Sequence, residues 1–447
     1  MDNKYLKRAR YGVDLALKLG ADLAEAYIGK NRELSIDVRD GQVETMKLAE
    51  ETGLGVRVML GGHTGFAFTS ENSRQALEEA VKHALANARN TAEDPMRILP
   101  EPVSQYPAMD IYDPEIINTP VEQKIELARV MEQEARDYDS RVSVIESSSY
   151  YDGEAAVILV NSHGVEASYS SSYCGLYLAL VAGECPESQT GFALDYRLRM
   201  AGLDPGRVGR EAARRAVRML GARPVPSGNF PVILDNFVAT GLLGVLAPAL
   251  TAEAVQKGRS LFADRVGEKV ASGLITLIDD GTLEGGVASA PFDGEGAPSS
   301  VTVLIQDGQL QGYLHNVYTA AKDGVMSTGN GIRGSFKSTP EVGATNFFIK
   351  PGQMTPEQLM EDIKSGFYVT EVLGMHTANP ITGHFSVGAS GIWIEDGQLT
   401  RPVRGVALAG NIKDVLTSIE GVGSDLRFYG GKGCPSLRVA GMAVSGR

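Results

Sequence analysis

The chain has 447 residues, with 42 Lys and Arg against 55 Asp and Glu, so its formal charge at pH 7 is −13. Such an acidic chain lacks the positive field that attracts phosphate backbones or anionic lipid, which argues against direct binding to nucleic acid or to a membrane surface. Hydrophobic residues make up 43% of the chain, enough apolar material for roughly two or three folded domains.

Cysteine usage and apolar runs bear on where the protein works. The three cysteines are too few and too scattered for a disulfide framework, which favours a reducing cytoplasm. The nearest approach to a membrane span, 237–254, is interrupted by Pro248 and Glu253. The amino terminus has no apolar run of the kind found in signal peptides. We therefore expect neither a membrane span nor export.

The amino-terminal part of the chain is typical of a helix, two hairpins and a second helix. Apolar residues recur over 4–19 with the 3.6-residue period of an amphipathic helix. An alternating segment then turns at Asp40-Gly41, which favours a hairpin because both turn positions need positive φ. We expect a second hairpin at Gly61-Gly62, and a helix capped by Ser70 or Asn72 after it.

A second unit of the same kind follows. Residues 91–119 are rich in Pro, Asn and Asp and show no period, which indicates a long surface connection. Next we expect a helix at 121–138, a set of short antiparallel strands, and a helix that Asp204-Pro205 opens. The predicted strands cover 142–149, 154–160, 165–172, 175–184 and 190–198.

Gly and Pro mark a domain boundary at 223–229. We therefore predict an amino-terminal α+β domain, 1–222, and a β-rich carboxyl-terminal domain, 223–447. In the second domain we expect a helix at 237–254, followed by short strands that Asp-Gly and Gly-Gly turns separate. The fold class is α+β, with large antiparallel sheets.

Several common catalytic and binding motifs are absent. The GxGxxG spelling at 329–334 lacks the following helix of a dinucleotide site, because Pro340 would end it, so a structural or substrate-lining loop is the better interpretation. None of the six histidines belongs to HExxH or HExxxH, in which one helix gives zinc two imidazoles and a Glu activates water. The GxSxG turn of serine hydrolases is missing too.

The most unusual stretch is the polar segment 374–391. His376 and His384 lie on either side of Asn379-Pro380, so a loop could bring both rings together, with Cys434 as a third zinc ligand. This spacing follows no established ligand pattern, and we favour side chains that bind loop backbone or line a channel without metal. We assign no metal ligand and keep His376, His384 and Cys434 as an alternative set.

Many segments resemble the TldD/PmbA proteins, which are also called modulators of DNA gyrase. In the amino-terminal half the similar segments are 24–27, 38–41, 53–58 and 65–68. In the carboxyl-terminal half they are 318–320, 327–331 with Arg333, 385–395, 402–403, 409–414 and 423–426. They follow the order of the family and cover nearly the whole chain.

The resemblance implies an amino-terminal α+β domain, a β-rich carboxyl-terminal domain, and a zinc protease built from two kinds of subunit that acts on flexible or unfolded peptides. TldD-type chains hold zinc through HExxxH and a cysteine nearer the carboxyl terminus, and TldE/PmbA-type chains lack that motif. Here 241–250 stands where the motif would be, without a histidine or an acid. The chain therefore resembles the TldE/PmbA type, and no zinc ligand of the family can be placed on it.

We accordingly expect no catalytic residue and no cofactor in this chain, with zinc only in a TldD-type partner subunit. Without that partner, the chain could form a homodimer. An exposed sheet edge could hold a peptide as an added strand. The residues that we expect to line a shared substrate channel are His376, Asn379, His384, Ser386, Ser390, Asn330 and Arg333.

Two other functions remain open on the sequence. The chain could be a hydrolase that acts by itself through His376, His384 and Cys434. It could also be a non-enzymatic protein that modulates DNA gyrase, and its charge of −13 would then require it to act by protein contact.

Overall fold

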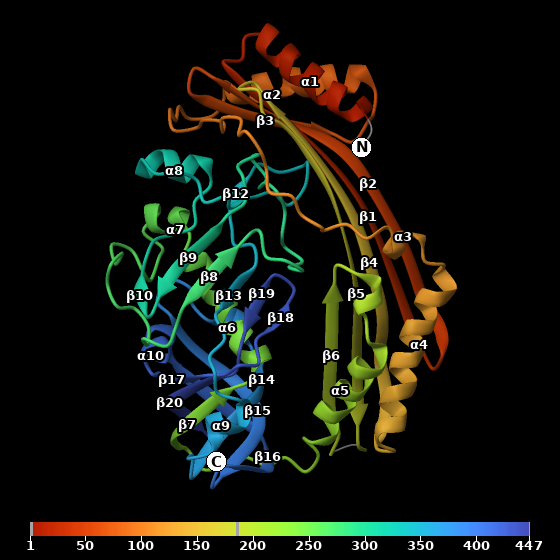
Figure 1. Ribbon diagram of the computed structural model, residues 1–447, viewed down its shortest axis with the longest axis vertical. Coiled ribbons are helices and arrows are strands. Elements are labelled where there is room, and N and C mark those ends of the chain that lie inside the picture. The colour runs from red at the N-terminus through yellow and green to blue at the C-terminus, as the bar shows by residue number, and fades with distance from the viewer. Residues whose placement is uncertain (1–2, 185–186, 447) are drawn as a thin grey trace.

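The amino-terminal half of the protein is built on a long antiparallel sheet (Figure 1). The computed structural model describes residues 3–184 and 187–446. The sheet has the strand order β3-β2-β1-β4-β5-β6. Its strands are β1 (Leu23–Arg39), β2 (Gln42–Leu60), β3 (His63–Thr69), β4 (Val142–Asn161), β5 (Glu166–Ala182) and β6 (Gln189–Arg197).

Both predicted hairpin turns are confirmed. Asp40 and Gly41 have φ values of 51° and 70°, and Gly61 and Gly62 have values of 55° and 77°. Because these values lie in the left-handed region, the turns match the twist of the strands that they join. The two hairpins share one strand, since β2 is continuous.

The strand predicted at 190–198 is confirmed as β6, but the predicted breaks at 150–153 and 173–174 are wrong, because β4 and β5 are each one long strand. Gly153 lies within the first of these predicted breaks, and Gly175 comes directly after the second. A Cβ at Gly153 would lie 2.4 Å from the ring of Tyr173, and one at Gly175 would lie 2.6 Å from the ring of Tyr196. Each glycine therefore makes room for an aromatic ring of the neighbouring strand, and the ladder continues past it.

The helices of this half pack on one face of the sheet, at alternate positions of the strands. In Figure 1, α1 (Asn3–Lys18) and α2 (Arg74–Ala88) lie over the upper part, and α4 (Val121–Tyr138) and α5 (Pro205–Val217) lie over the lower part. The predicted helices at 4–19 and 121–138 and the one opened by Asp204 are confirmed. The cap of α2 is Ser73, not Ser70 or Asn72. The connection before α4 contains one short helix, α3 (Pro114–Asn118), and η1 (Met200–Gly202) precedes α5.

A small closed barrel forms the base of the carboxyl-terminal half. Its strands, in the order of their hydrogen bonds, are β7 (Gly228–Leu234), β14 (Ser365–Leu373), β15 (His384–Glu395), β16 (Gln398–Asn411) and β20 (Leu437–Ser445). Pairing of β16 with β20 closes the circle, and β17 (Ile419–Val422) pairs with part of β20. Phe367, Trp393 and Val439 are among the side chains that fill its interior. Closure leaves few free strand edges here.

A second sheet lies above the barrel, with α6 (Asn236–Ala249) packed between them (Figure 1). Its strands, in spatial order, are β10 (Gln309–Leu310), β9 (Val301–Gln306), β8 (Leu277–Asp280), β13 (Phe347–Ile349), β19 (Lys432–Cys434) and β18 (Arg427–Tyr429). The remaining elements are α8 (Val317–Asp323), β11 (Gly331–Ile332), β12 (Glu341–Val342), α9 (Pro356–Met360), η2 (Met375–Thr377) and α10 (Ile412–Thr417). The predicted α+β class is confirmed.

The helix predicted at 237–254 is two helices, α6 and α7 (Ala252–Gln256). Pro248 lies in the last turn of α6, where it has no N–H to continue the helix. Thr251 then caps α7 by accepting a hydrogen bond from the N–H of Ala254. None of the helices in the described parts of the chain is long and apolar enough to cross a bilayer.

A buried charge cluster joins the sheet to the carboxyl-terminal half. Arg57 on β2 forms ion pairs with Glu25 on β1, at 2.8 Å, and with Glu295 of the carboxyl-terminal half, at 3.2 Å. Arg333 forms an ion pair with the other oxygen of Glu25. All four side chains are at most 3% exposed. Because each charge is paired, the cluster can be buried at this junction.

An aromatic ring fills a hollow beside this cluster. Phe336 is 1% exposed and lies over Gly53 and Gly55 of β2. A Cβ at Gly53 would lie 2.1 Å from the Phe336 ring, so only glycine lets the ring reach the sheet. The close contact fits the carboxyl-terminal half to the face of the sheet that α1 and α2 leave open.

We predict that Phe336→Ala lowers the free energy of unfolding by about 3–5 kcal/mol, because it removes a large buried ring and leaves a cavity at the junction. The midpoint of urea unfolding measures the change. Met326→Ala is the matched control, since Met326 is 88% exposed, and it should change stability by less than about 0.5 kcal/mol. Equal effects of the two substitutions would contradict the assigned role of Phe336.

Candidate functional site

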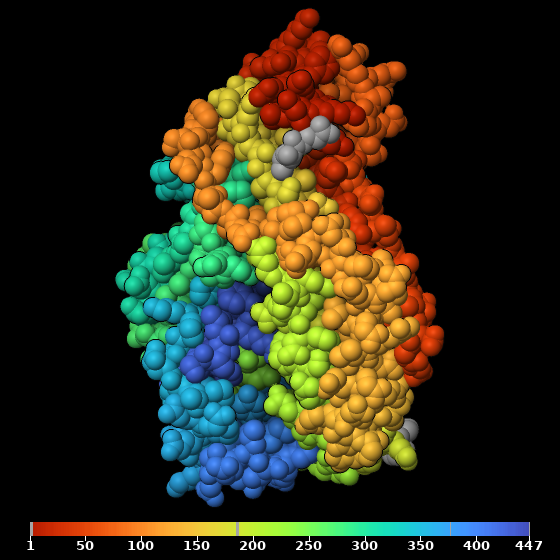
Figure 2. Space-filling view, turned by 45° about the vertical axis from the view of Figure 1, so that its right-hand side comes forward, coloured from red at the N-terminus to blue at the C-terminus, as the bar shows by residue number. Residues whose placement is uncertain are grey.

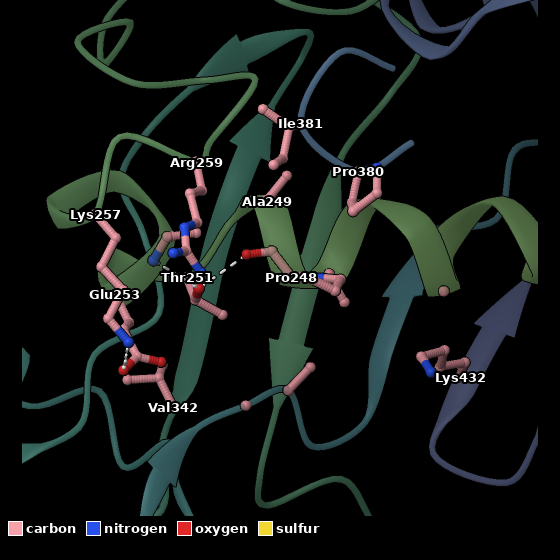
Figure 3. Close-up of a pocket in the computed structure, with 15 residues that line it drawn as sticks. Pro248, Ala249, Thr251, Glu253, Lys257, Arg259, Val342, Pro380, Ile381 and Lys432 are labelled. Atoms are coloured by element: carbon pink, nitrogen blue, oxygen red, sulfur yellow. Dashed lines mark hydrogen bonds and ion pairs between the residues drawn. The ribbon is translucent and has the colours of Figure 1, made fainter. Parts of the chain in front are cut away.

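A pocket opens over α6 in the carboxyl-terminal half (Figure 3). Its volume is about 540 Å³. Gly244 and Pro248 lie one helical turn apart and form part of its floor. The walls come from the segment around α7, from residues 342–344, from Pro380 and Ile381, and from Lys432 on β19. Segments distant in sequence thus enclose one cavity.

The floor of this pocket is chemically inert. Gly244 and Pro248 are the exposed positions of α6, while neighbours such as Leu243 and Leu246 are buried in the core. Neither exposed residue has a side-chain atom that can bind a metal or carry a proton. Pro248 also has no N–H to donate to the carbonyl of Gly244, so this carbonyl loses its usual donor within the helix.

Positive charge lies around the rim. The ammonium of Lys257 is neutralised by Glu253, with Nζ 2.6 Å from Oε1. The side chains of Arg259 and Lys432 form no hydrogen bond or ion pair with the residues that the structure describes. Figure 3 places them on different sides of the floor. Apart from these cations and Glu253, the lining is mainly apolar.

The polar segment 374–391 contributes to this pocket through its turn. Asn379 accepts hydrogen bonds at Oδ1 from the N–H groups of Ile381, at 2.8 Å, and Thr382, at 3.0 Å. These bonds shape the turn that brings Pro380 and Ile381 to the wall. Asn379 itself is exposed beside the wall and is not among the lining residues.

The other predicted channel residues of this segment lie on β15. His384 is exposed at the first position of the strand. Ser386, also exposed, and Ser390, partly exposed, alternate with buried residues, so they point out of the barrel. The side chain of His376 lies outside the described parts of the structure. A channel role for His376, His384, Ser386 and Ser390 stays a prediction.

The side chains of Asn330 and Arg333 are buried, and Asn330 supports the wall of the pocket. Asn330 is 1% exposed and donates hydrogen bonds to Asp279, at 2.7 Å, and to the carbonyl of Gly343, at 3.0 Å. Gly343 lines the pocket, so Asn330 holds this wall in place. Arg333 belongs to the charge cluster, and its guanidinium lies 4.6 Å from the centre of the Tyr27 ring. Neither side chain offers a peptide an exposed surface in this structure.

Cys434 and His384 lie in different surroundings. Cys434 is completely buried in the core on β19, and burial raises the pKa of its thiol well above the ordinary value. A buried, protonated thiol is neither a good nucleophile nor a ready metal ligand. Within residues 3–184 and 187–446, no group of three or more His, Cys, Asp or Glu side chains is arranged to hold a metal ion.

A second hollow lies between the amino-terminal sheet and the carboxyl-terminal half, as Figure 2 shows between the yellow-green and blue segments. Its volume is about 560 Å³. Arg427 on β18 spans it, with ion-pair contact to Glu211 of α5 at 2.8 Å and a hydrogen bond to the carbonyl of Leu194 on β6 at 3.2 Å. β6 and β18 are the edge strands of their sheets. Free strand edges are the usual docking places for extended peptides.

A buried carboxyl group begins the pocket helix. Asp235 caps α6 and accepts a hydrogen bond from the N–H of Val238 at 2.9 Å. Burial raises the pKa of Asp235 to about 6, although the backbone donor and the nearby Arg215 and Arg218 lower it in part.

Sequence reasoning missed the rim cations and the inter-sheet arginine. Arg259, Lys432 and Arg427 belong to no motif, and only the folded chain brings them to a cavity. One signal was available, because the resemblance placed the zinc motif at 241–250, which includes the pocket floor.

Three families match successive parts of the chain: "PmbA/TldA metallopeptidase domain 1" over residues 24–88, the "central domain" over 114–220 and the "C-terminal domain" over 227–446. The chain belongs to the PmbA/TldD metallopeptidase family. The resemblance stated from the sequence is thereby confirmed.

Members of the family from several organisms are similar over nearly their whole length. Metalloprotease PmbA of Escherichia coli O157:H7 is 30% identical over 97% of this chain and 95% of its own. A metalloprotease TldD homolog of Haemophilus influenzae is 30% identical over 91% of this chain and 86% of its own. The family thus includes both PmbA and TldD proteins.

Solved structures share the fold. A putative modulator of a DNA gyrase from Thermotoga maritima superposes with a TM-score of 0.92 at 27% identity, over 99% of this chain and 100% of that one. TldE from Thermococcus kodakarensis superposes with a TM-score of 0.90 at 23% identity, over 99% and 100%. The second likeness concerns the fold alone.

We predict that Asp235 makes stability depend on pH. The folded carboxyl holds its proton up to about pH 6, whereas the unfolded one loses it near 3.8, so the free energy of unfolding falls as pH rises between these values. The fall should be about 3 kcal/mol, at roughly 1.4 kcal/mol for each pKa unit. Asp235→Asn keeps a capping side chain and should remove this part of the pH dependence.

Urea unfolding of both proteins from pH 4 to pH 8 measures the effect. The difference between them should change through about pH 6 and level off near pH 7. Parallel stability curves over the whole range would show that Asp235 is ionised normally in the folded protein.

Proposed function

We propose that this chain is the TldE/PmbA-type, non-catalytic subunit of a TldD/TldE metalloprotease that acts on flexible or unfolded peptides. The observation that carries the proposal is the floor of the α6 pocket. In the segment where the family's zinc motif would stand, the exposed positions are Gly244 and Pro248, which cannot bind an ion.

The remaining chemistry of the chain supports this division of work. Hydrolysis of an amide without a metal needs a nucleophile held beside a base. The thiol of Cys434 is buried and its pKa is raised, so it does not meet that need. A subunit without catalytic groups can still position a substrate for its partner.

In this proposal the subunit holds an extended peptide. The α6 pocket offers an apolar cavity with positive groups at its rim. The edges of β6 and β18 offer backbone groups that pair with any sequence. Backbone hydrogen bonds do not depend on the side chains of the peptide. They therefore suit substrates that are all flexible but have no common sequence motif.

The proposal assigns zinc to a TldD-type partner subunit, no cofactor to this chain, and the cytoplasm as the place of assembly. TldD and TldE proteins occur among the relatives. The chain pairs with itself only when the partner is absent, and it binds neither nucleic acid nor membrane, in keeping with its charge of −13.

We predict that the purified chain cleaves a flexible peptide only when it is mixed with a TldD-type subunit that carries HExxxH. Cleavage is followed by chromatography of the products, with each subunit alone as a control. A chelator should abolish cleavage by the mixture, since zinc activates the attacking water.

The chain alone should contain much less than one zinc per molecule by elemental analysis, and Cys434→Ala should not change cleavage by the mixture. Chelator-sensitive cleavage by the chain alone would overturn the proposal in favour of a hydrolase that acts by itself. Specific capture of gyrase at physiological salt, without any peptide cleavage, would favour the modulator instead.

A further inference from the structure

We propose that the α6 pocket is a carboxylate-binding site, in which Arg259 or Lys432, the cations on either side of the floor, binds a carboxylate group of a peptide. The inference rests on the proposed function only in taking a peptide as the ligand. It assigns a ligand chemistry to a cavity that lacks catalytic groups.

The lining of the pocket has more positive than negative groups. Three cations, Lys257, Arg259 and Lys432, face one carboxylate, Glu253. Glu253 is engaged by Lys257 at 2.6 Å, which leaves the guanidinium of Arg259 and the ammonium of Lys432 without anionic partners among the described residues. Elsewhere most arginines of this acidic chain, such as Arg57 and Arg427, are paired. The two unpaired cations at one cavity therefore favour an anionic ligand.

An apolar surface lies between these cations. Ala247, Pro248, Val342, Ala344 and Ile381 line the cavity, and Ile381 is 48% exposed. An apolar pocket with a few placed charges is the usual form of a ligand site. A bound side chain would displace water here, and the lower local dielectric would strengthen attraction between a carboxylate and the cations. Arginine suits this role because its fork matches the two oxygens of a carboxylate.

The floor of the pocket has no side chain that would compete with a ligand for the cations. The carbonyl of Gly244 has lost its helical donor because residue 248 is proline, and Gly244 is exposed. The floor therefore presents backbone and a proline ring, with no charged side chain that would compete for the rim cations. The pocket thus offers a peptide an apolar wall for a side chain and a cation on either side of the floor for a carboxylate. A simple inorganic anion would use only the last of these.

Two parts of a peptide carry a carboxylate: the carboxyl terminus and an Asp or Glu side chain. Both present the same planar group to Arg259 or Lys432. Three hexapeptides of one apolar sequence, each labelled at the amino terminus, separate the sources. One ends in a free carboxylate, one is amidated, and one is amidated with Glu at its last position.

Binding of these peptides to the full chain, without partner subunit or zinc, is measured by fluorescence anisotropy. We expect at least one carboxylate-bearing peptide to bind about tenfold more tightly than the plain amidated peptide, as for a charge-assisted hydrogen bond. If only the free acid binds more tightly than the plain amide, the ligand is the carboxyl terminus. If the amidated Glu peptide also binds more tightly than the plain amide, an acidic side chain is a ligand. The preference should weaken as salt is raised.

The double variant Arg259→Gln, Lys432→Gln should abolish the preference. Lys364→Gln is the charge control, because Lys364 is exposed on the loop before β14 and lines no part of the pocket, and it should leave the preference intact. Gly244→Leu should weaken all three peptides, because a Cβ at Gly244 points into open space and a longer side chain would fill the cavity. Gly244→Ala is its control for folding.

Equal binding of all three peptides would overturn the inference, as would an equal loss of the preference in the Lys364→Gln control. The outcome is independent of the proposed subunit role. A chain that prefers carboxylates but does not support cleavage with a TldD-type partner would keep this site and refute the role, and the reverse result would keep the role and refute the site.

Discussion

The buried ion pairs between the amino-terminal sheet and the carboxyl-terminal half determine how the rest of the molecule is arranged. Arg57 pairs with Glu25 and Glu295, and Arg333 also pairs with Glu25. Removal of one partner would leave a buried charge without compensation, so the four groups are held in one geometry. Arg333 follows β11, which pairs with β12, and β12 leads into the pocket wall at 342–344. The wall of the pocket is therefore connected to the distant sheet.

The sequence predicts local structure correctly where a turn residue or a helix cap determines the backbone conformation. Asp40-Gly41 predicted its hairpin because few other residues accept that backbone, and Asp204 predicted its helix because its carboxyl accepts the first N–H groups. The predicted strand breaks next to Gly153 and Gly175 are wrong. In the sequence, a glycine that makes room for a neighbouring ring cannot be distinguished from one that turns the chain. Only the strand beside it distinguishes the two cases. Closure of the barrel depends on pairing between β16 and β20, and no local pattern announces such a contact.

The site was predictable only in part, for a related reason. Resemblance led to the segment that forms the pocket floor, and the turn at Asn379 does reach the wall. The sequence predicts channel residues where polar side chains cluster, yet Asn330 and Arg333 use their hydrogen-bonding groups within the protein itself. The reverse holds for Arg259 and Lys432, which look like ordinary surface cations in the sequence. Whether a polar group is satisfied internally is a property of the folded chain.

The position of β7 in the barrel has a consequence for biosynthesis. β7 lies between β14 and β20, both of which come much later in the chain. When β7 leaves the ribosome, its backbone groups have no neighbouring strand, whereas the amino-terminal sheet can already assemble. The nascent carboxyl-terminal half must therefore wait with an open, apolar strand until β20 has been made. That interval is the stage at which chaperones would be needed most.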